Sequence, residues 1–442
     1  MGDLLYRNSI YAGEGRDNVR TIKCWMLSLI LLTVLLQGCG KENPTEQMKT
    51  KEAVVIPVIF RVNPENNIGE YQDMVNEFNR LYEGQYYVEV EWMTDTASGY
   101  REKIKTLNAL DKLPAIITDA CFDRNFYELC IANGRFINLE PYIEESEEWK
   151  ECISQDMLEE CREADGGIYV SPLGNPIYSS AGIFYNKELF AKAGITKMPD
   201  TWAGFQQCLD ILKQQGITPF AMHGAGSYWS PMLVSTAYMA TDPKGEEFMK
   251  TAFPDSYSND SMKKLLSMMD KLYYYTYQDA LEIDFAAAAQ RFYKGEAAMI
   301  ANGYWMIDEM DEEVRERTGF ATFPNDTMMC SGRMSAWAIV SGYSQEVTQG
   351  AVAFLKYRSL VSQEDMEKFM QNNEVSLVEK EYRKAIQTVQ KIIPNYQLYW
   401  EPGLYNDFFT EMMPFYLNGT YDKDSFLETM DQKLIQIQKA KG

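Results

Sequence analysis

The side chains that most enzymes use for acid–base and metal chemistry are scarce in this sequence or are not gathered into a motif. The chain has a single histidine, His223, among 442 residues, which argues against multi-histidine metal sites and against catalysis that needs several imidazoles. It contains no G-x-S-x-G, H-E-x-x-H or phosphate-binding glycine loop. Nothing in the sequence marks two of its 64 acidic residues as a catalytic pair. We therefore expect no enzyme, no metal and no cofactor.

Cysteine spacing gives no redox or zinc motif either. Besides Cys24 and Cys39 the chain has six cysteines, and no two of them stand in a C-x-x-C arrangement. Two readings stay open: the six are buried thiols, or they form disulfides in an oxidising compartment, with a pairing that spacing does not reveal. The six are Cys121, Cys130, Cys152, Cys161, Cys208 and Cys330.

Composition and charge describe a large folded acidic protein. Hydrophobic residues make up 46% and charged residues 24% of the chain, enough for a sizeable core, and its length favours two or three domains. The net charge of -22 repels phosphate backbones. Nucleic acid is therefore excluded as an expected partner.

The N-terminal region has the order of a bacterial export signal. Basic Arg20 and Lys23 precede the apolar run 25–36, and Gln37-Gly38-Cys39 follows it. That run is too short to span a bilayer, which needs roughly 20 residues, so cleavage is expected. Leu36-Gln37-Gly38-Cys39 resembles the lipobox of lipoproteins. In that motif the cysteine becomes the lipidated first residue, with fatty acyl chains such as palmitate that anchor it to a membrane.

The residues around this signal complete the predicted N-terminal region. Residues 1–18 carry acidic side chains that do not suit a signal peptide, so we suspect a misassigned start, with Val19 as the candidate first codon. Residues 1–38 are thus predicted to be a signal peptide with a possible misassigned start. Residues 39–53, rich in Lys, Glu, Thr and Gln, are predicted to be a lipidated tether.

From Val54 onward, short apolar runs alternate with helical periodicity, which is typical of an α/β fold. Expected strands are 54–60, 88–92, 114–118, 168–172, 182–185, 219–222, 297–301, 319–323 and 336–340. Expected helices are 71–82, 187–193 and 201–213, and most of the chain after Glu346 is predicted to be helical.

Several motifs, in the same order along the chain, resemble one family. They are Gly182-Ile183-Phe184-Tyr185-Asn186-Lys187-Glu188-Leu189-Phe190, Pro199-Asp200-Thr201-Trp202, Gly216-Ile217-Thr218-Pro219, Gly295-Glu296-Ala297-Ala298-Met299, Asn302-Gly303-Tyr304-Trp305, Ala336-Trp337-Ala338-Ile339 and Ala353-Phe354-Leu355-Lys356-Tyr357. The chain from Val54 to its C-terminus is similar to the extracellular solute-binding proteins of sugar ABC transporters, which include maltose-binding protein.

The resemblance implies a two-lobed periplasmic-binding-protein-like fold of type II, with lobes joined by a hinge and a helical C-terminal part. Ligand is expected in the cleft between lobes, and closure is the signal that a membrane permease reads. By resemblance, lobe 1 comprises residues 54–174 and 327–372. Lobe 2 comprises residues 175–326 and 373–442.

Sugars have apolar C–H faces and hydroxyl rims, so a sugar site needs flat aromatic rings and polar side chains. The resemblance places Trp305 and Trp229 at positions of ligand stacking, with Trp337 as a further aromatic candidate. The family's usual Pro-Asp-Ile is here Pro114-Ala115-Ile116, which removes one aspartate that other members carry. The expected polar or C-terminal contacts are Asn63, Glu65, Asn66, Asp119, Ser179, Tyr405 and Asn406.

The predicted function is non-catalytic capture of a mono- or oligosaccharide and its delivery to ABC transporter permease subunits. The protein is expected to be a monomer, lipid-anchored through Cys39 on the extracellular face of the cell membrane, as in Gram-positive surface lipoproteins. Two alternatives remain: a sensory lipoprotein that signals to a membrane kinase, and a binder of another solute such as a peptide or polyamine.

Overall fold

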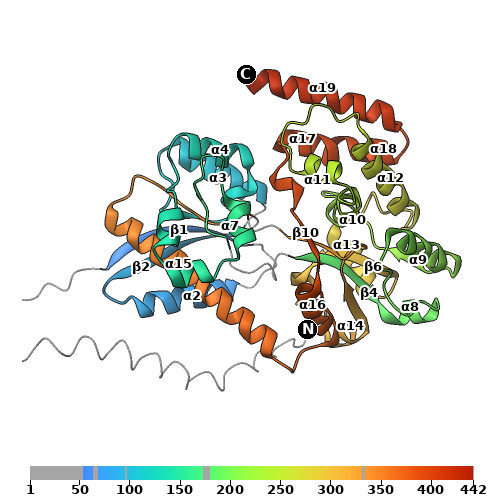
Figure 1. The fold of residues 1–442 in the computed structure, drawn as a ribbon, viewed down its shortest axis with the longest axis horizontal. Coiled ribbons are helices and arrows are strands. Elements are labelled where there is room, and N and C mark those ends of the chain that lie inside the picture. The colour runs from blue at the N-terminus through green and yellow to red at the C-terminus, as the bar shows by residue number, and fades with distance from the viewer. Residues whose placement is uncertain are drawn as a thin grey trace, which may run out of the picture. The chain divides into compact units, whose positions relative to one another are not determined.

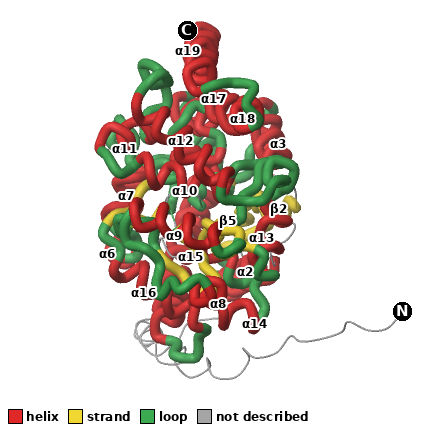
Figure 2. The backbone as a smooth tube through the Cα atoms, turned by 90° about the vertical axis from the view of Figure 1, so that its right-hand side faces the viewer, coloured by secondary structure: helices red, strands yellow, loops and turns green. Residues whose placement is uncertain are grey.

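The computed structural model describes residues 53–62, 68–94, 97–172, 180–330, 333 and 335–441 (Figure 1). It is an α/β fold, as predicted, with two sheets: the first packs in one hydrophobic core, and the second packs in two, which we call the second and third cores. Helices account for most of the regular structure (Figure 2). Among the described helices, none combines the length and the apolar character needed to span a membrane.

The first sheet has the strand order β2-β1-β3-β9. Its strands are β1 (Val54–Val62), β2 (Tyr86–Thr94), β3 (Ile116–Ile117) and β9 (Ala338–Ile339). β1 pairs in parallel with β2 and β3, while β9 pairs antiparallel with β3. Ile56, Val58, Ile59 and Phe60 of β1 are buried. This continuous apolar run is what a strand covered on both faces requires.

Helices surround this first sheet. They are α2 (Ile68–Leu81), α3 (Ala97–Ala109), α4 (Arg124–Ala132), α5 (Glu140–Glu144), α6 (Glu147–Glu151), α7 (Gln155–Cys161) and α15 (Gln345–Gln371), with a 3₁₀ turn η1 (Ala120–Phe122). The long α15 packs against β1 and α2. The expected strand 168–172 is not formed, because Ile168 and Ser171 make only isolated bridges, to Arg162 and Trp337.

The second sheet has the order β10-β8-β4-β6-β5, with β7 also paired to β4. Its strands are β4 (Ala181–Asn186), β5 (Thr218–Phe220), β6 (Ala297–Gly303), β7 (Thr318–Ala321), β8 (Thr327–Met329) and β10 (Lys391–Ile393). β4 and β6 are antiparallel, with Gly182 opposite Asn302. The sequence pattern missed β8 and β10, since such short strands show no readable alternation.

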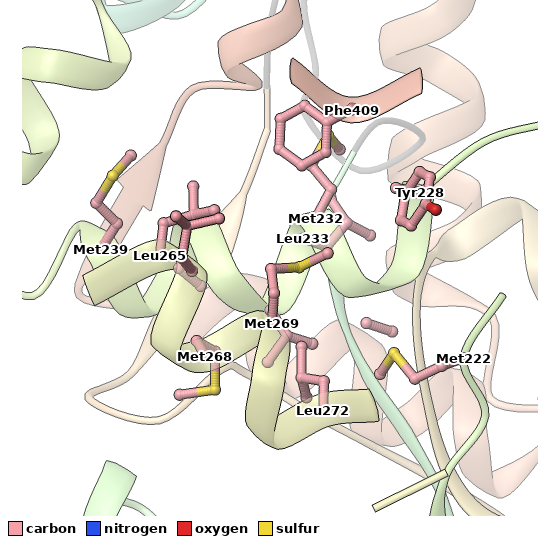
Figure 3. Close-up of a cluster of buried hydrophobic side chains, with 14 of the residues drawn as sticks. Met222, Tyr228, Met232, Leu233, Met239, Leu265, Met268, Met269, Leu272 and Phe409 are labelled. Carbon is pink, nitrogen blue, oxygen red and sulfur yellow. The ribbon is translucent and has the colours of Figure 1, made fainter. Parts of the chain in front are cut away.

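The second core is rich in methionine. α10 (Trp229–Met239) packs against α12 (Asp260–Tyr274), and their Met and Leu side chains interdigitate (Figure 3). Unbranched methionine fills irregular gaps between helices.

The remaining helices of this part are α8 (Lys187–Lys192), α9 (Trp202–Gln214), α11 (Pro243–Met249), α13 (Phe285–Tyr293), α14 (Glu312–Arg317), α16 (Leu377–Thr388), α17 (Pro402–Asn406), α18 (Met413–Leu417) and α19 (Lys423–Lys441). This part also contains the 3₁₀ turns η3 (Tyr304–Met306) and η4 (Tyr396–Leu398) and the π-helical turn η5 (Asp407–Met412).

The six cysteines after Cys39 are all buried and all free in the structure. Burial is the main cause that raises the thiol pKa of Cys121, Cys130 and Cys208 to about 12. A thiol with such a pKa is protonated near neutral pH and is a weak nucleophile. Of the two readings left open by the sequence, the structure favours buried thiols.

A buried arginine joins separate stretches of the first core. Arg358, in α15, is 4% exposed and donates to the backbone carbonyls of Ser171 at 3.3 Å and Ser335 at 2.6 Å. Its guanidinium lies 3.8 Å from the centroid of the Trp337 ring, and Ser171 and Trp337 also exchange backbone hydrogen bonds. Burial lowers the pKa of Arg358 to about 10, so it stays charged near neutral pH. The Arg358 side chain therefore holds together the backbone at Ser171 and the backbone at Ser335.

Arg358→Met is expected to lower the free energy of unfolding by about 2 kcal/mol, because a charged hydrogen bond to Ser335 and a cation–π contact are both lost. Urea denaturation measures the change. Arg135→Met is the matched control: Arg135 is 35% exposed and ion-paired with Asp111, and a surface pair of this kind contributes about 0.5 kcal/mol or less. Equal losses in the two variants would contradict the assigned role.

The lone histidine is a core residue. His223 has no exposed surface, its Nε2 accepts the backbone N–H of Ser230 at 3.2 Å, and its ring packs edge-on against Phe285. Burial lowers its pKa to about 4, although the nearby Asp284 acts in the opposite direction. The imidazole is therefore neutral at neutral pH and works as a hydrogen-bond acceptor.

The depressed pKa of His223 predicts a loss of stability in acid. Between about pH 6.5 and about pH 4 the unfolded chain binds a proton at this residue that the folded chain does not. The free energy of unfolding therefore falls as pH falls, by about 3 kcal/mol in total. His223→Gln keeps an acceptor for Ser230 but removes this titration. Urea denaturation across the window should give diverging curves for the two proteins, and parallel curves would refute the prediction.

Candidate functional site

Trp229 and Trp305, two of the predicted ligand contacts, lie close together at the end of β6. Trp229 is the first residue of α10, and Trp305 lies in η3, directly after β6. Their ring centroids are 6.2 Å apart and the ring planes are inclined by 44°. Both side chains are half-buried. Each ring therefore keeps part of its surface accessible, as a stacking partner for a ligand needs.

Hydrogen bonds fasten the start of α10 to this strand. The indole Nε1 of Trp229 donates to Oδ1 of Asn302 at 2.9 Å, and Oγ of Ser230 donates to the carbonyl of Ala301 at 2.7 Å. Asn302 is fully buried. It is a residue of the candidate site that the sequence analysis did not predict, although the Asn-Gly pair directly after the expected strand 297–301 was an available signal.

Asp119 lies at the end of β3 in the first sheet, where the sequence placed it. Its backbone is left-handed, with φ of 49°, a conformation that Asp tolerates better than most residues. Nε of Arg61 donates to its carboxylate at 2.6 Å. Burial raises the pKa of Asp119, and the charge of Arg61 opposes that rise. The carboxylate is thus engaged within the protein.

Trp337 is 3% exposed. One ring face lies against the Arg358 guanidinium, and Phe60 packs edge-on at 4.6 Å between centroids. These contacts place Trp337 in the first core. Its role as a ligand contact stays a prediction.

The C-terminal candidates lie on α17. Tyr405 is half-buried among Tyr396 and Phe409, and its hydroxyl lies 3.9 Å from Sδ of Met232. Asn406, at the end of the same helix, is exposed. Their contact with ligand also stays a prediction.

Five predicted residues lie outside the described residues. They are Asn63, Glu65, Asn66, Ser179 and the lipidation candidate Cys39. Their roles therefore remain as the sequence predicted them.

Two surface hollows lie elsewhere on the second part of the chain. One, of about 460 Å³, is lined by residues that include Pro199, Ala321 and Asn325. The other, of about 360 Å³, lies between the start of α11 and α12. Neither is lined by an aromatic ring or by a predicted site residue. We therefore place the candidate site at the indole pair, where aromatic surface and a buried amide coincide.

Comparisons with known proteins agree on the type of molecule. A probable sugar-binding periplasmic protein from Brucella suis biovar 1 is 31% identical over 180 residues, which are 40% of this chain and 41% of that protein. One with the same description from Rhizobium meliloti is 30% identical over 156 residues, 34% of this chain and 36% of that protein. The matched part thus spans about two fifths of the length of these relatives.

Solved structures match over most of both chains. A chitin oligosaccharide binding protein superposes with a TM-score of 0.68 at 20% identity, covering 87% of this chain and 98% of that one. A Streptococcus pneumoniae solute-binding protein in complex with the blood group A-trisaccharide gives 0.66 at 19% identity, covering 86% and 99%. These likenesses confirm the predicted two-lobed fold. Since the profile of the bacterial extracellular solute-binding protein family also matches residues 65–359, the chain belongs to that family.

Proposed function

We propose that this chain captures a carbohydrate between its two lobes, performs no chemistry on it and delivers it to the permease of an ABC transporter. The observation that carries the proposal is the pair of half-buried indoles, Trp229 and Trp305. A flat indole face suits the apolar C–H face of a sugar ring, and amide or hydroxyl groups suit its rim. Such a site binds by contact and needs no reactive group.

The relatives support a sugar as the ligand. Two are described as probable sugar-binding periplasmic proteins. One similar structure is a chitin oligosaccharide binding protein, and another holds a trisaccharide. Carried over to this chain, these descriptions make a carbohydrate the first class of ligand to test.

We propose the lobes as residues 54–174 with 330–372 and residues 175–329 with 373–442, which moves the boundary predicted at residue 327 by three positions. The separate cores around the two sheets support this division. Because β8 pairs within the second sheet while Cys330 packs in the first core, we place the second crossing after β8. The helix α15 contributes Phe354, near its middle, to the first core, and Met366, near its end, to the third core, which packs on the second sheet.

The proposed sugar site predicts a ligand-dependent rise in stability. Thermal unfolding of residues 40–442 should shift upward with at least one class of mono- or oligosaccharide, because ligand binds only the folded state. Trp305→Ala should weaken that binding by about 2 kcal/mol, or roughly 30-fold in Kd, as for a central stacking aromatic. Isothermal calorimetry with the active sugar measures the loss.

Trp202→Ala is the matched control for that substitution. Trp202 is also half-buried in the second part of the chain, but it packs against Phe205 and Tyr238, away from the indole pair. Its loss should lower the melting temperature and leave Kd for the sugar unchanged. If both variants lose affinity equally, the effect is one of folding and the site assignment fails.

The same titrations separate the alternative ligands. A polyamine site needs carboxylates that face the amine, yet Asp119, the one acid among the predicted site residues that the structure describes, is already ion-paired with Arg61. A thermal shift with peptides or polyamines alone would overturn the carbohydrate proposal.

A sensory role is distinguished by uptake: deletion of the cognate permease abolishes uptake of the sugar only if the protein serves transport.

We also propose that Cys39 carries a lipid anchor that holds the protein on the extracellular face of the cell membrane. Two acyl chains suffice for stable anchoring, whereas one is marginal. In cells that express the full chain, Cys39→Ser should abolish incorporation of labelled palmitate and release the protein from the membrane fraction. Unchanged labelling would show that another residue is acylated, and Cys24→Ser is the control that should leave it intact.

A further inference from the structure

The geometry of the indole pair is set by two consecutive residues at the end of β6. Asn302 and Gly303 are the last residues of that strand, and η3 with Trp305 follows at once. Each of the two contacts a different indole. The first holds Trp229 by a hydrogen bond, and the second leaves room for Trp305.

Asn302 fixes the orientation of Trp229. An indole N–H is only a donor, so the atom 2.9 Å from it must be the amide oxygen of Asn302. Within the described part of the chain, the amide nitrogen has no hydrogen-bond partner, so Trp229 is what orients the amide. Because the residue is fully buried, water does not compete for the bond, and the indole is held in one rotamer.

Gly303 makes room for Trp305. A Cβ at this position lies 2.2 Å from Cζ3 of the Trp305 ring, far inside van der Waals contact. The backbone φ of Gly303 is −97°, which any residue adopts. Glycine is therefore required here for space and not for backbone conformation, and a larger residue displaces the ring.

The spacing of the rings determines how a ligand fits. To stack a sugar ring between two parallel aromatic faces, the faces must be about 7 Å or more apart, twice the usual contact distance. The two centroids here are 6.2 Å apart with planes inclined by 44°. The pair therefore does not clamp one ring. We call the two rings a platform, and a ligand that contacts both indoles must extend from one ring to the other.

We propose that Asn302 and Gly303 are positioning residues that hold Trp229 and Trp305 as one platform, and that this platform selects saccharides of at least two linked rings over their constituent monosaccharide. The inference rests on the proposed function. A disaccharide places one ring on each indole, whereas a monosaccharide covers only one. The second stacking contact is worth about tenfold in Kd.

The first measurement needs no ligand. Two indoles at this distance and inclination give an exciton couplet in far-ultraviolet circular dichroism. Asn302→Leu removes the acceptor, and Gly303→Ala displaces Trp305, so both variants should lose the couplet. Asn186→Leu is the matched control, because Asn186 is also buried on the second sheet but caps α8 through the amides of Glu188 and Leu189. That control should lower the melting temperature and retain the couplet.

The second measurement is the ratio of Kd for a monosaccharide to Kd for its disaccharide, by calorimetry. Wild type and Asn186→Leu should prefer the disaccharide by about tenfold, and the ratio should fall toward one in Asn302→Leu and Gly303→Ala. If Asn302→Leu does not fold, Gly303→Ala alone decides, because Trp305 is half-buried and a Cβ at Gly303 displaces its ring.

The outcomes separate the inference from the function on which it rests. A retained couplet in folded Asn302→Leu and Gly303→Ala overturns the positioning role. A wild-type protein that binds both saccharides equally overturns the length selection and leaves sugar binding intact. A wild-type protein that binds no saccharide overturns the proposed function, and the selection falls with it.

Discussion

The first lobe depends on one buried cation. The Arg358 guanidinium donates to the carbonyls of Ser171 and Ser335 and covers the Trp337 ring. Ser171 precedes the second sheet in the chain and Ser335 follows β8, and the described residue Ser171 pairs with Trp337 only through an isolated bridge. A charged donor in a dry interior is strong only while its acceptors stay in place. The same helix, α15, reaches the third core, on the second sheet, through Met366, so the helix that carries this arginine packs against both lobes.

The second lobe supplies a stiff frame for the indoles. All seven residues of β6 are buried, and its end is bonded to the first turn of α10 through Asn302 and Ala301. His223 accepts from Ser230 in the same turn, so the helix start is held from two sides. A neutral imidazole can accept that bond and a protonated one cannot. Acid that protonates His223 therefore loosens the turn that carries Trp229.

Sequence reasoning predicted the fold class and the family because long apolar runs and ordered motifs are local signals. This reasoning predicted the strands β1, β2 and β6 and the helix α9. Thr201 caps α9, as predicted. It could not find Arg358 or the Arg61–Asp119 pair, since these contacts join residues far apart in the chain. Trp229 and Trp305 were predicted separately, but the hydrogen bond between Trp229 and Asn302 follows only from the packing of α10 against β6.

A preformed platform moves the entropy cost of ordering the two indole side chains from the binding step to the folding step. Fixing a large side chain costs free energy whenever it happens, about 0.5–1.5 kcal/mol for an interface side chain. In this protein the hydrogen bond to Asn302 fixes Trp229 during folding, and the absence of a side chain at Gly303 lets Trp305 settle beside it. In the proposed site a sugar would therefore meet rings that are already ordered, and more of the stacking energy would appear as affinity. Under this proposal, a change at Asn302 weakens binding without removing any atom that touches the sugar.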